Sequence, residues 1–228
     1  MNNSNTVSSL LATLALAGGA AMVLAQYFIW FYAPVEATMG LVQKIFYLHL
    51  PVAWWGLICF FTVFCASIAF LVRKSPVMDQ LAVSAAEVGL LLSTLALATG
   101  SLWARISWNT WWTWDPRLST ALIMWFIYAG YLVLRQSIEG QRKMRMVAAV
   151  LGVVAFLNVP LVFLSARMWR SIHPAVFASE GGGLEPEMMT TVVVCVIAMG
   201  LVTAALVLMR FRQKNLQERL WNLYMYRD

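Results

Sequence analysis

The densest group of side chains able to bind a ligand lies in the segment 108–117, which reads WNTWWTWDPR. Its tryptophans are Trp108, Trp111, Trp112 and Trp114, and with Trp103 they make five of the chain's 11. Indole rings offer flat apolar faces and an N–H donor, and the interleaved Thr, Asn, Asp and Arg add hydrogen-bonding groups. This mixture favours a platform for a large planar ligand. An aromatic belt at the depth of lipid headgroups is the alternative.

The chain has two histidines, His49 in FYLHLP and His173 in MWRSIHP. Neutral imidazole is a common iron ligand, and two imidazoles on opposite faces of a planar macrocycle give a six-coordinate haem. Two imidazoles make a poor zinc site, because zinc usually takes three or four protein ligands and the three cysteines form no CxxC pair. Haem is therefore the better ligand, although a lone histidine near a membrane surface is often only a packing residue.

Several charged residues accompany these groups. The arginines are Arg105, Arg117, Arg167 and Arg170. Arginine binds carboxylates in a bidentate manner and could hold haem propionates, but it also snorkels toward lipid phosphates. Asp115 precedes Pro116, a combination that is typical of a helix start, so a capping role is also expected for this carboxylate.

The composition determines the kind of structure that presents these residues. Hydrophobic residues make up 61% of the chain and charged residues 11%, against about 25% charged residues in soluble domains. This excludes a water-soluble fold. Six apolar runs are long enough to cross a bilayer as helices, near 9–32, 48–72, 81–102, 118–135, 146–166 and 189–210. We predict an all-α integral membrane protein with six transmembrane helices in one membrane domain, residues 1–228.

The basic residues predict the orientation of these helices. Eleven of the 16 Lys and Arg fall on the side that also holds both chain ends, and five fall on the other side. By the positive-inside rule both termini are cytoplasmic, and the Trp loop 103–117 and both histidines face outward.

The basic residues form no single stripe, so no nucleic-acid partner is expected. Glu87 in the third run is expected to make a packing or partner contact. Asn158-Val159-Pro160 is expected to bend the fifth run, and the tail after Arg212 to form a basic helix on the membrane surface.

The segment WNTWWTWDPRLS resembles the tryptophan-rich WWD signature of haem-handling membrane proteins in cytochrome c maturation. With FYLHLP and NVPLVFLSARMWRSIHP, it makes the chain similar to the haem exporter protein C (CcmC) family. One departure is Asn109, where the signature WGTWW has glycine. Asparagine adopts left-handed backbone conformations more readily than most residues, so we expect the turn to survive.

The resemblance implies that the chain binds haem b at the periplasmic face of the bacterial inner membrane, with His49 and His173 as axial ligands. Trp108, Trp111, Trp112, Trp114 and Asp115 would form the platform that presents haem to the periplasmic chaperone CcmE for covalent attachment. The implied partners are the ABC transporter subunits CcmA and CcmB and the small membrane protein CcmD, besides membrane lipid. The chain has no Walker motif, and whether it catalyses the attachment step stays open.

Two alternatives remain. One is a haem b membrane anchor subunit of an electron-transfer complex, which is disfavoured because such anchors hold haem on histidines inside the bundle. The other is a structural subunit of an ABC transporter, which would not need the clustered tryptophans.

Overall fold

The computed structural model describes residues 2–169, 171–173 and 184–225, and in these ranges it is helical without a regular strand. Six helical segments are long and apolar enough to span a membrane, which confirms the predicted all-α, six-span fold. The helices are α1 (Asn2–Tyr27), α2 (Phe46–Arg73), α3 (Pro76–Ser107), α4 (Pro116–Ser137), α5 (Gln141–Ala155), α6 (Asn158–Met168) and α7 (Pro186–Met225).

The helices begin and end at residues whose backbone preferences favour these points. Proline occupies the start of α3, α4 and α7, where its missing N–H costs nothing because the first helical N–H groups have no partner within the helix. Asp115 caps α4 by accepting a hydrogen bond from the backbone N–H of Arg117 at 2.9 Å. Lys74 ends α2 in a left-handed conformation with φ of 53°.

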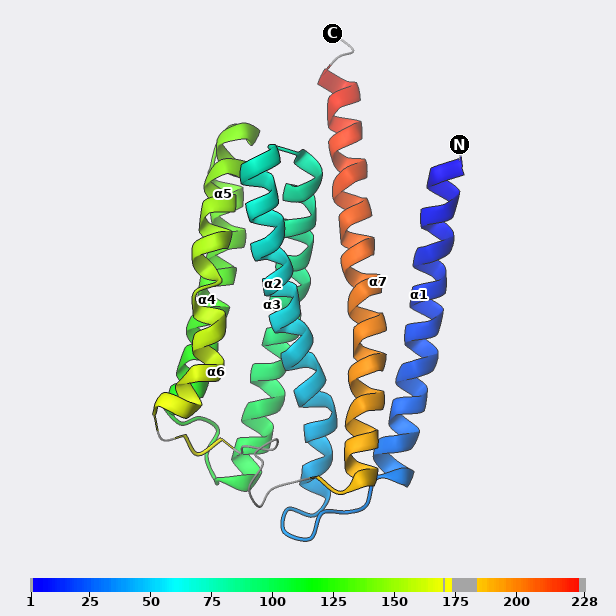
Figure 1. The fold of residues 1–228 in the computed structure, drawn as a ribbon, viewed down its shortest axis with the longest axis vertical. Helices are drawn as coiled ribbons and strands as arrows, with labels where there is room; N and C mark the ends of the chain where they lie inside the picture. The colour runs from blue at the N-terminus through cyan, green and yellow to red at the C-terminus, as the bar shows by residue number, and fades with distance from the viewer. Residues whose placement is uncertain (1, 170, 174–183, 226–228) are drawn as a thin grey trace.

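The helices form two groups that share α2 (Figure 1). Helices α2 to α6 pack around one apolar core, in which Phe60 and Tyr128 stack with ring centroids 3.6 Å apart. Helices α1 and α7 stand side by side and share a second core with the start of α2. At Gly200 of α7 an added Cβ would lie 2.4 Å from Trp55 of α2, so glycine permits the close approach of these helices.

The fifth span is interrupted, as the sequence predicted. Helix α5 ends at Ala155 and α6 begins at Asn158. Pro160 has no N–H to offer the carbonyl four residues earlier, and the Phe156 carbonyl instead accepts a hydrogen bond from the N–H of Val159 at 2.9 Å. The Asn158 side chain donates to the Thr120 carbonyl of α4 at 3.0 Å, which fixes the break against its neighbour.

Helix α7 is 40 residues long and much exceeds the predicted span 189–210. The tail after Arg212 continues this helix instead of forming a separate surface helix. Ion pairs hold the continuation against the bundle: Arg145 lies 2.9 Å from Glu218, and Lys214 lies 2.9 Å from Glu87. Glu87 also pairs with Arg210 at 2.6 Å, so its carboxylate contacts α7 of the same chain.

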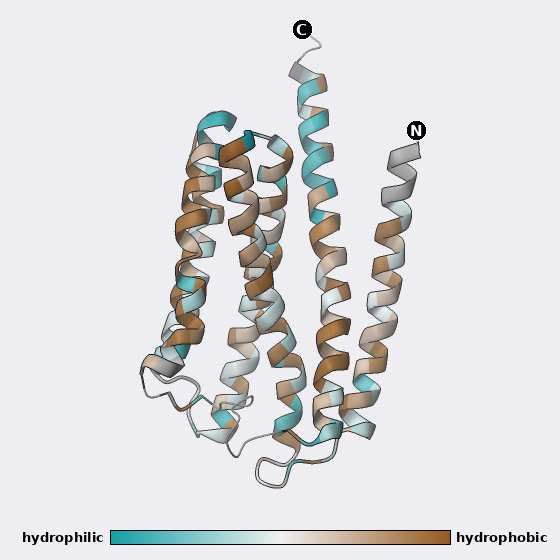
Figure 2. Ribbon diagram, in the orientation of Figure 1, coloured by the Kyte–Doolittle hydropathy of each residue, from teal (hydrophilic) through white to brown (hydrophobic). Residues whose placement is uncertain are grey.

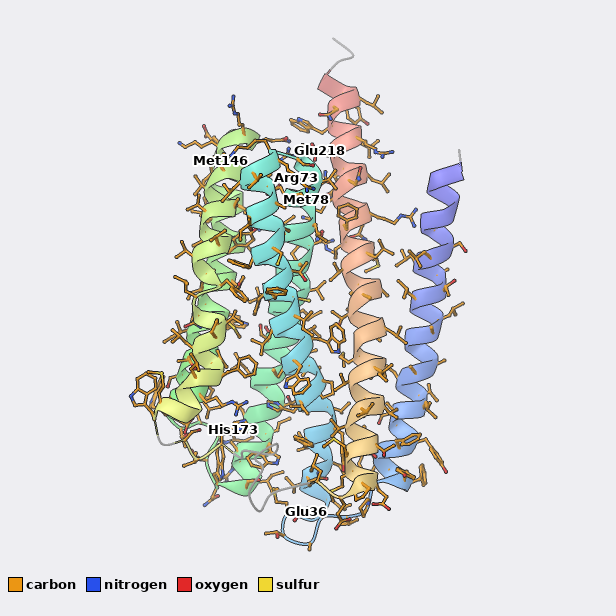
Figure 3. All side chains as sticks on the ribbon, viewed as in Figure 1. Glu36, Arg73, Met78, Met146, His173 and Glu218 are labelled. Carbon is orange, nitrogen blue, oxygen red and sulfur yellow. The ribbon has the colours of Figure 1, made fainter. Side chains whose placement is uncertain are left out.

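The two ends of the bundle differ in composition. The start of α1 and the end of α7 lie at the same end of the bundle, here called the terminal end, where hydrophilic residues gather on α5 and α7 (Figures 1 and 2). At this end Asp79 accepts two hydrogen bonds from Arg135, at 2.6 and 2.7 Å. The opposite end, here called the loop end, carries Glu36 and His173 (Figure 3).

Candidate functional site

The two histidines meet at the loop end although they are far apart in the sequence. His49 lies in the first turn of α2, and His173 lies in the segment after α6. Their ring centroids are 6.5 Å apart, and the ring planes make an angle of 35°. A metal–imidazole bond is about 2.0 Å long and the ring centre lies about 1.1 Å behind the nitrogen, so two imidazoles on opposite sides of one metal have centroids about 6.2 Å apart. The separation therefore fits a bis-imidazole iron.

The His49 ring is held by α3. Its Nδ1 lies 2.9 Å from the hydroxyl oxygen of Thr99. The next residue, Gly100, has its backbone so close to the ring that an added Cβ would lie 3.1 Å from Cε1. With Nδ1 engaged, Nε2 is the nitrogen left for a ligand.

The segment that carries His173 is tied to Asp115. One carboxylate oxygen, Oδ1, accepts from the Ser171 hydroxyl at 3.0 Å, and Oδ2 accepts from the Ile172 N–H at 2.9 Å. The Ser171 hydroxyl oxygen in turn accepts from the His173 N–H at 3.1 Å. We call Asp115, Ser171 and Ile172 the Asp115 latch.

The chemistry of Asp115 agrees with this positioning role. The residue is 8% exposed, and burial by itself would raise the pKa of its carboxyl. The hydrogen bonds from Ile172, Arg117, Ser171 and Leu118 favour the charged form and outweigh burial, so the pKa lies below its usual value. Because its oxygens are engaged within the protein, the carboxylate orients the loop end more directly than it offers a face to a ligand.

The Trp loop is arranged as edge-to-face pairs instead of one flat surface. Trp103 and Trp108 meet at 85° with centroids 5.1 Å apart, and Trp112 and Trp114 meet at 80° with centroids 6.0 Å apart. Trp114 is 78% exposed and Trp111 58% exposed, whereas Trp108 and Trp112 are half-buried. Trp111 and Trp114 are thus available to a partner or ligand, and Trp112 supports Trp114.

Asn109 adopts the left-handed conformation expected of it, with φ of 54°. Its side-chain and backbone oxygens both accept from the Arg105 guanidinium, at 2.5 and 2.9 Å. The same guanidinium lies 5.9 Å from the centre of the Trp111 ring. Arg105 thus braces the turn and one of its exposed rings, a role that the sequence did not suggest.

Of the other three arginines, only Arg117 has a side chain among the described residues. Arg117 is half-buried at the start of α4 and lies within the range of an electrostatic interaction with His49. Arg170 and the side chain of Arg167 lie outside the described residues.

Sequence reasoning missed three residues that contact the histidines or their segment: Thr99, Gly100 and Ser171. Threonine, glycine and serine are common in membrane helices and loops, so their types carry no signal without the fold. Ser171 lies two positions before His173, which is the only hint that the sequence offers. Among the described residues, no group of three or more His, Cys, Asp or Glu side chains could hold a metal ion unaided.

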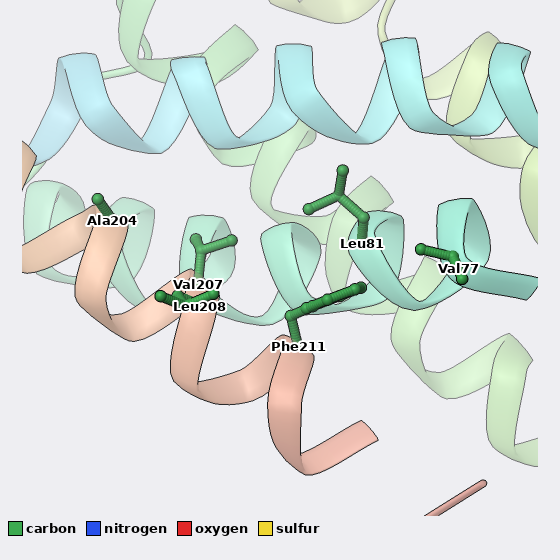
Figure 4. Close-up of a pocket in the computed structure, with 6 residues that line it drawn as sticks. All are labelled: Val77, Leu81, Ala204, Val207, Leu208 and Phe211. Carbon is green, nitrogen blue, oxygen red and sulfur yellow. The ribbon is translucent and has the colours of Figure 1, made fainter. Parts of the chain in front are cut away.

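An apolar cavity of about 430 Å³ lies toward the terminal end, between α3 and α7 (Figure 4). Its lining residues are Val77, Leu81, Ala204, Val207, Leu208 and Phe211. Val77 and Leu81 belong to the first turns of α3, whereas Thr99 and Gly100 lie near its other end. The cavity is therefore separate from the histidine pair.

Comparison with known proteins shows the family of the chain. The family model described as heme exporter protein C matches residues 2–225, nearly the whole chain. The chain belongs to the heme exporter protein C family. A heme exporter protein C of Bradyrhizobium diazoefficiens is 34% identical over 195 residues, which cover 85% of this chain and 74% of the relative.

Two further family members are more distant. The heme exporter protein C of Escherichia coli K12 is 29% identical, over 86% of this chain and 81% of the relative. A putative cytochrome c biosynthesis ccmC-like mitochondrial protein of Marchantia polymorpha is 28% identical, over 81% of this chain and 78% of the relative. The similarity thus extends along most of the chain in both bacterial and mitochondrial relatives.

Proposed function

We propose that this protein binds haem b at the loop end and presents it to the periplasmic haem chaperone CcmE during cytochrome c maturation. The observation that carries the proposal is the 6.5 Å separation of the His49 and His173 rings. An iron between them would take one nitrogen from each imidazole, and the porphyrin would supply the other four ligands. Membership of the heme exporter protein C family supports the same ligand.

The Trp loop supplies the surface for transfer in this proposal. Trp111 and Trp114 are the exposed rings of the loop, and they would contact haem or the chaperone through apolar faces. The half-buried Trp112 would support Trp114, and the half-buried Trp108 would pack against Trp103. Arg117 interacts electrostatically with His49 and would bind a haem propionate.

The charge asymmetry supports the orientation that this function needs. The excess of Lys and Arg at the terminal end favours a cytoplasmic location for it, so the loop end would face the periplasm of the bacterial inner membrane. CcmA, CcmB and CcmD are the partners that the family resemblance implies, with CcmA and CcmB as the ABC transporter subunits. The chain itself would act as a haem-handling factor.

The direct test of ligation is the absorption spectrum of the purified protein, oxidised and then reduced, for the parent and for His49→Gly and His173→Gly. We expect a six-coordinate low-spin spectrum in the parent and its loss in each variant. Added imidazole should restore the spectrum, because it replaces the missing ligand in the space left by glycine. Unchanged spectra and haem content in both variants would overturn the ligation scheme.

The Trp loop offers a matched pair for testing transfer. Trp111 is 58% exposed in the loop, and Trp30 is 56% exposed after α1. We expect Trp111→Ala to reduce loading of the chaperone while Trp30→Ala does not, with haem content equal in both. Equal losses in the two variants would support an aromatic belt instead of a platform. Stable haem that the chaperone cannot remove from the parent would favour an electron-transfer anchor.

A further inference from the structure

We propose that Thr99, with Gly100 beside it, positions His49 by fixing its tautomer, so that Nδ1 carries the proton and Nε2 is free to bind a metal. This inference rests on the proposed function for its purpose, since the metal is the haem iron. The tautomer itself can be measured without haem.

The Thr99 hydroxyl has one proton to donate. Its hydroxyl oxygen lies 2.7 Å from the Leu95 carbonyl oxygen and 3.2 Å from that of Ala96. A carbonyl has no proton to give, and about 2.7 Å is the usual length of an O–H···O hydrogen bond. The single hydroxyl proton of Thr99 is therefore donated to the backbone of its own helix.

The His49 ring contacts the same hydroxyl group. Its Nδ1 lies 2.9 Å from the same hydroxyl oxygen. Since the hydroxyl proton is already used, the proton in this contact has to come from the ring, and Nδ1–H donates to Thr99. Neutral imidazole carries one N–H, so Nε2 keeps its lone pair. A lone pair on this nitrogen is what iron ligation requires.

The position of the His49 ring depends on Gly100. An added Cβ at Gly100 would lie 3.1 Å from Cε1 and 3.6 Å from Nδ1 of His49. The ring thus rests on the backbone of α3, where a larger residue would displace it. In a metal-bound histidine, a hydrogen bond from the ring nitrogen that does not bind the metal fixes the ring orientation. Loss of this hydrogen bond costs about 10- to 100-fold in metal affinity. Thr99 and Gly100 provide this hydrogen bond and the space for the ring.

The small number of histidines makes the test direct. Protein labelled with ¹⁵N-histidine and carrying His173→Asn has one labelled ring, whose nitrogen chemical shifts report which nitrogen is protonated. In the haem-free protein we expect Nδ1–H. Thr99→Val removes the acceptor at nearly constant volume and should shift the population toward Nε2–H, whereas Thr99→Ser should restore the parental pattern.

A matched control comes from the same helix. Thr94 makes the same kind of backbone bond, 2.8 Å to the Leu90 carbonyl, but it accepts from Trp125 instead of His49. Thr94→Val should leave the His49 shifts unchanged. In haem titrations with His173 intact, Thr99→Val should weaken binding by about 10- to 100-fold and Thr94→Val should have little effect.

Two results would overturn the inference. One is Nε2–H in the Thr99-containing protein. The other is an unchanged Nδ1–H pattern and unchanged haem affinity in Thr99→Val, which would show that the Ala96 carbonyl, a second hydrogen-bond acceptor for the His49 ring, is sufficient. Absence of haem binding in the parent with the expected nitrogen shifts would instead refute the proposed function and leave the tautomer assignment standing.

Discussion

The substitution Asp115→Asn should separate two roles of one carboxylate. Asparagine is as good a helix cap as aspartate, so one side-chain oxygen can still accept from the Arg117 N–H and preserve the start of α4. The side-chain amide then replaces the oxygen that accepts from the Ile172 N–H at 2.9 Å. Two donors would face each other at that position, so the segment before His173 loses its bond from Ile172 and keeps only the one from the Ser171 hydroxyl.

The size of the effect follows from these contacts. A hydrogen bond to a charged group contributes about 1.5–3 kcal/mol, and the latch loses one such bond. At about 1.4 kcal/mol for each factor of ten, the docked segment becomes about 10- to 150-fold less populated relative to the undocked one. If His173 ligates only from the docked segment, haem affinity falls by up to the same factor and the low-spin fraction of the ferric protein decreases.

The assay is a haem titration followed by electron paramagnetic resonance of the ferric complex. Ser171→Ala is a useful companion, because it removes the hydroxyl that donates to Asp115 at 3.0 Å and accepts from His173 at 3.1 Å. We expect a smaller loss in this variant than in Asp115→Asn, since its partner carboxylate stays satisfied by the backbone. Affinity and low-spin content within twofold of the parent in Asp115→Asn would refute the latch.

Two other predictions concern packing and orientation. Gly200→Ala should lower the free energy of unfolding by about 1–3 kcal/mol, because its Cβ would lie 2.4 Å from Trp55. Gly19→Ala, whose Cβ would meet nothing within 4 Å, should be neutral or stabilising. Equal thermal stability of the two variants in detergent would contradict this prediction. The topology is tested in a chain whose native cysteines are replaced. A membrane-impermeant maleimide should label Ala37→Cys in intact spheroplasts and Glu139→Cys only after permeabilisation. Both residues are exposed, and the segments that hold them, after α1 and between α4 and α5, lie at opposite ends of the bundle (Figure 1). The reverse pattern would invert the predicted topology.

Most of the fold could be predicted because the membrane imposes it. Apolar runs of sufficient length have to form helices in lipid, and the structure has the six that hydropathy predicts. The helix break near Pro160 and the left-handed Asn109 also follow from local backbone preferences. These features depend on a few consecutive residues, which is why the sequence carries them.

The length of α7 could not be predicted in the same way. Its continuation past Arg212 is polar, so hydropathy ends the span early. The helix continues because Lys214 and Glu218 find partners on α3 and α5, and these contacts join residues that are distant in the chain.

The candidate site shows the same limit. Residue types pointed to His49, His173 and the Trp loop, but the 6.5 Å separation of the histidines depends on how α2, α3 and the segment after α6 meet. The tryptophan content predicted a platform for a planar ligand but not the ring orientations, and two pairs of these rings meet edge to face. Aromatic pairs favour such tilted contacts over face-to-face stacking, and composition alone does not determine ring orientation.

Within the proposed function, the two histidines differ in a way that suits a haem that has to leave. His49 belongs to α2 and rests on the backbone of α3, so its position is fixed by two packed helices. His173 lies in the segment after α6, where the two residues before it, Ser171 and Ile172, both donate to the Asp115 carboxylate. Release of that segment would remove one axial ligand and leave the other in place.

Because each ligand has its own support, Asp115→Asn should affect the His173 side and Thr99→Val the His49 side. The two substitutions should therefore have additive effects on the free energy of haem binding, unless the segment docks only when His49 is correctly oriented.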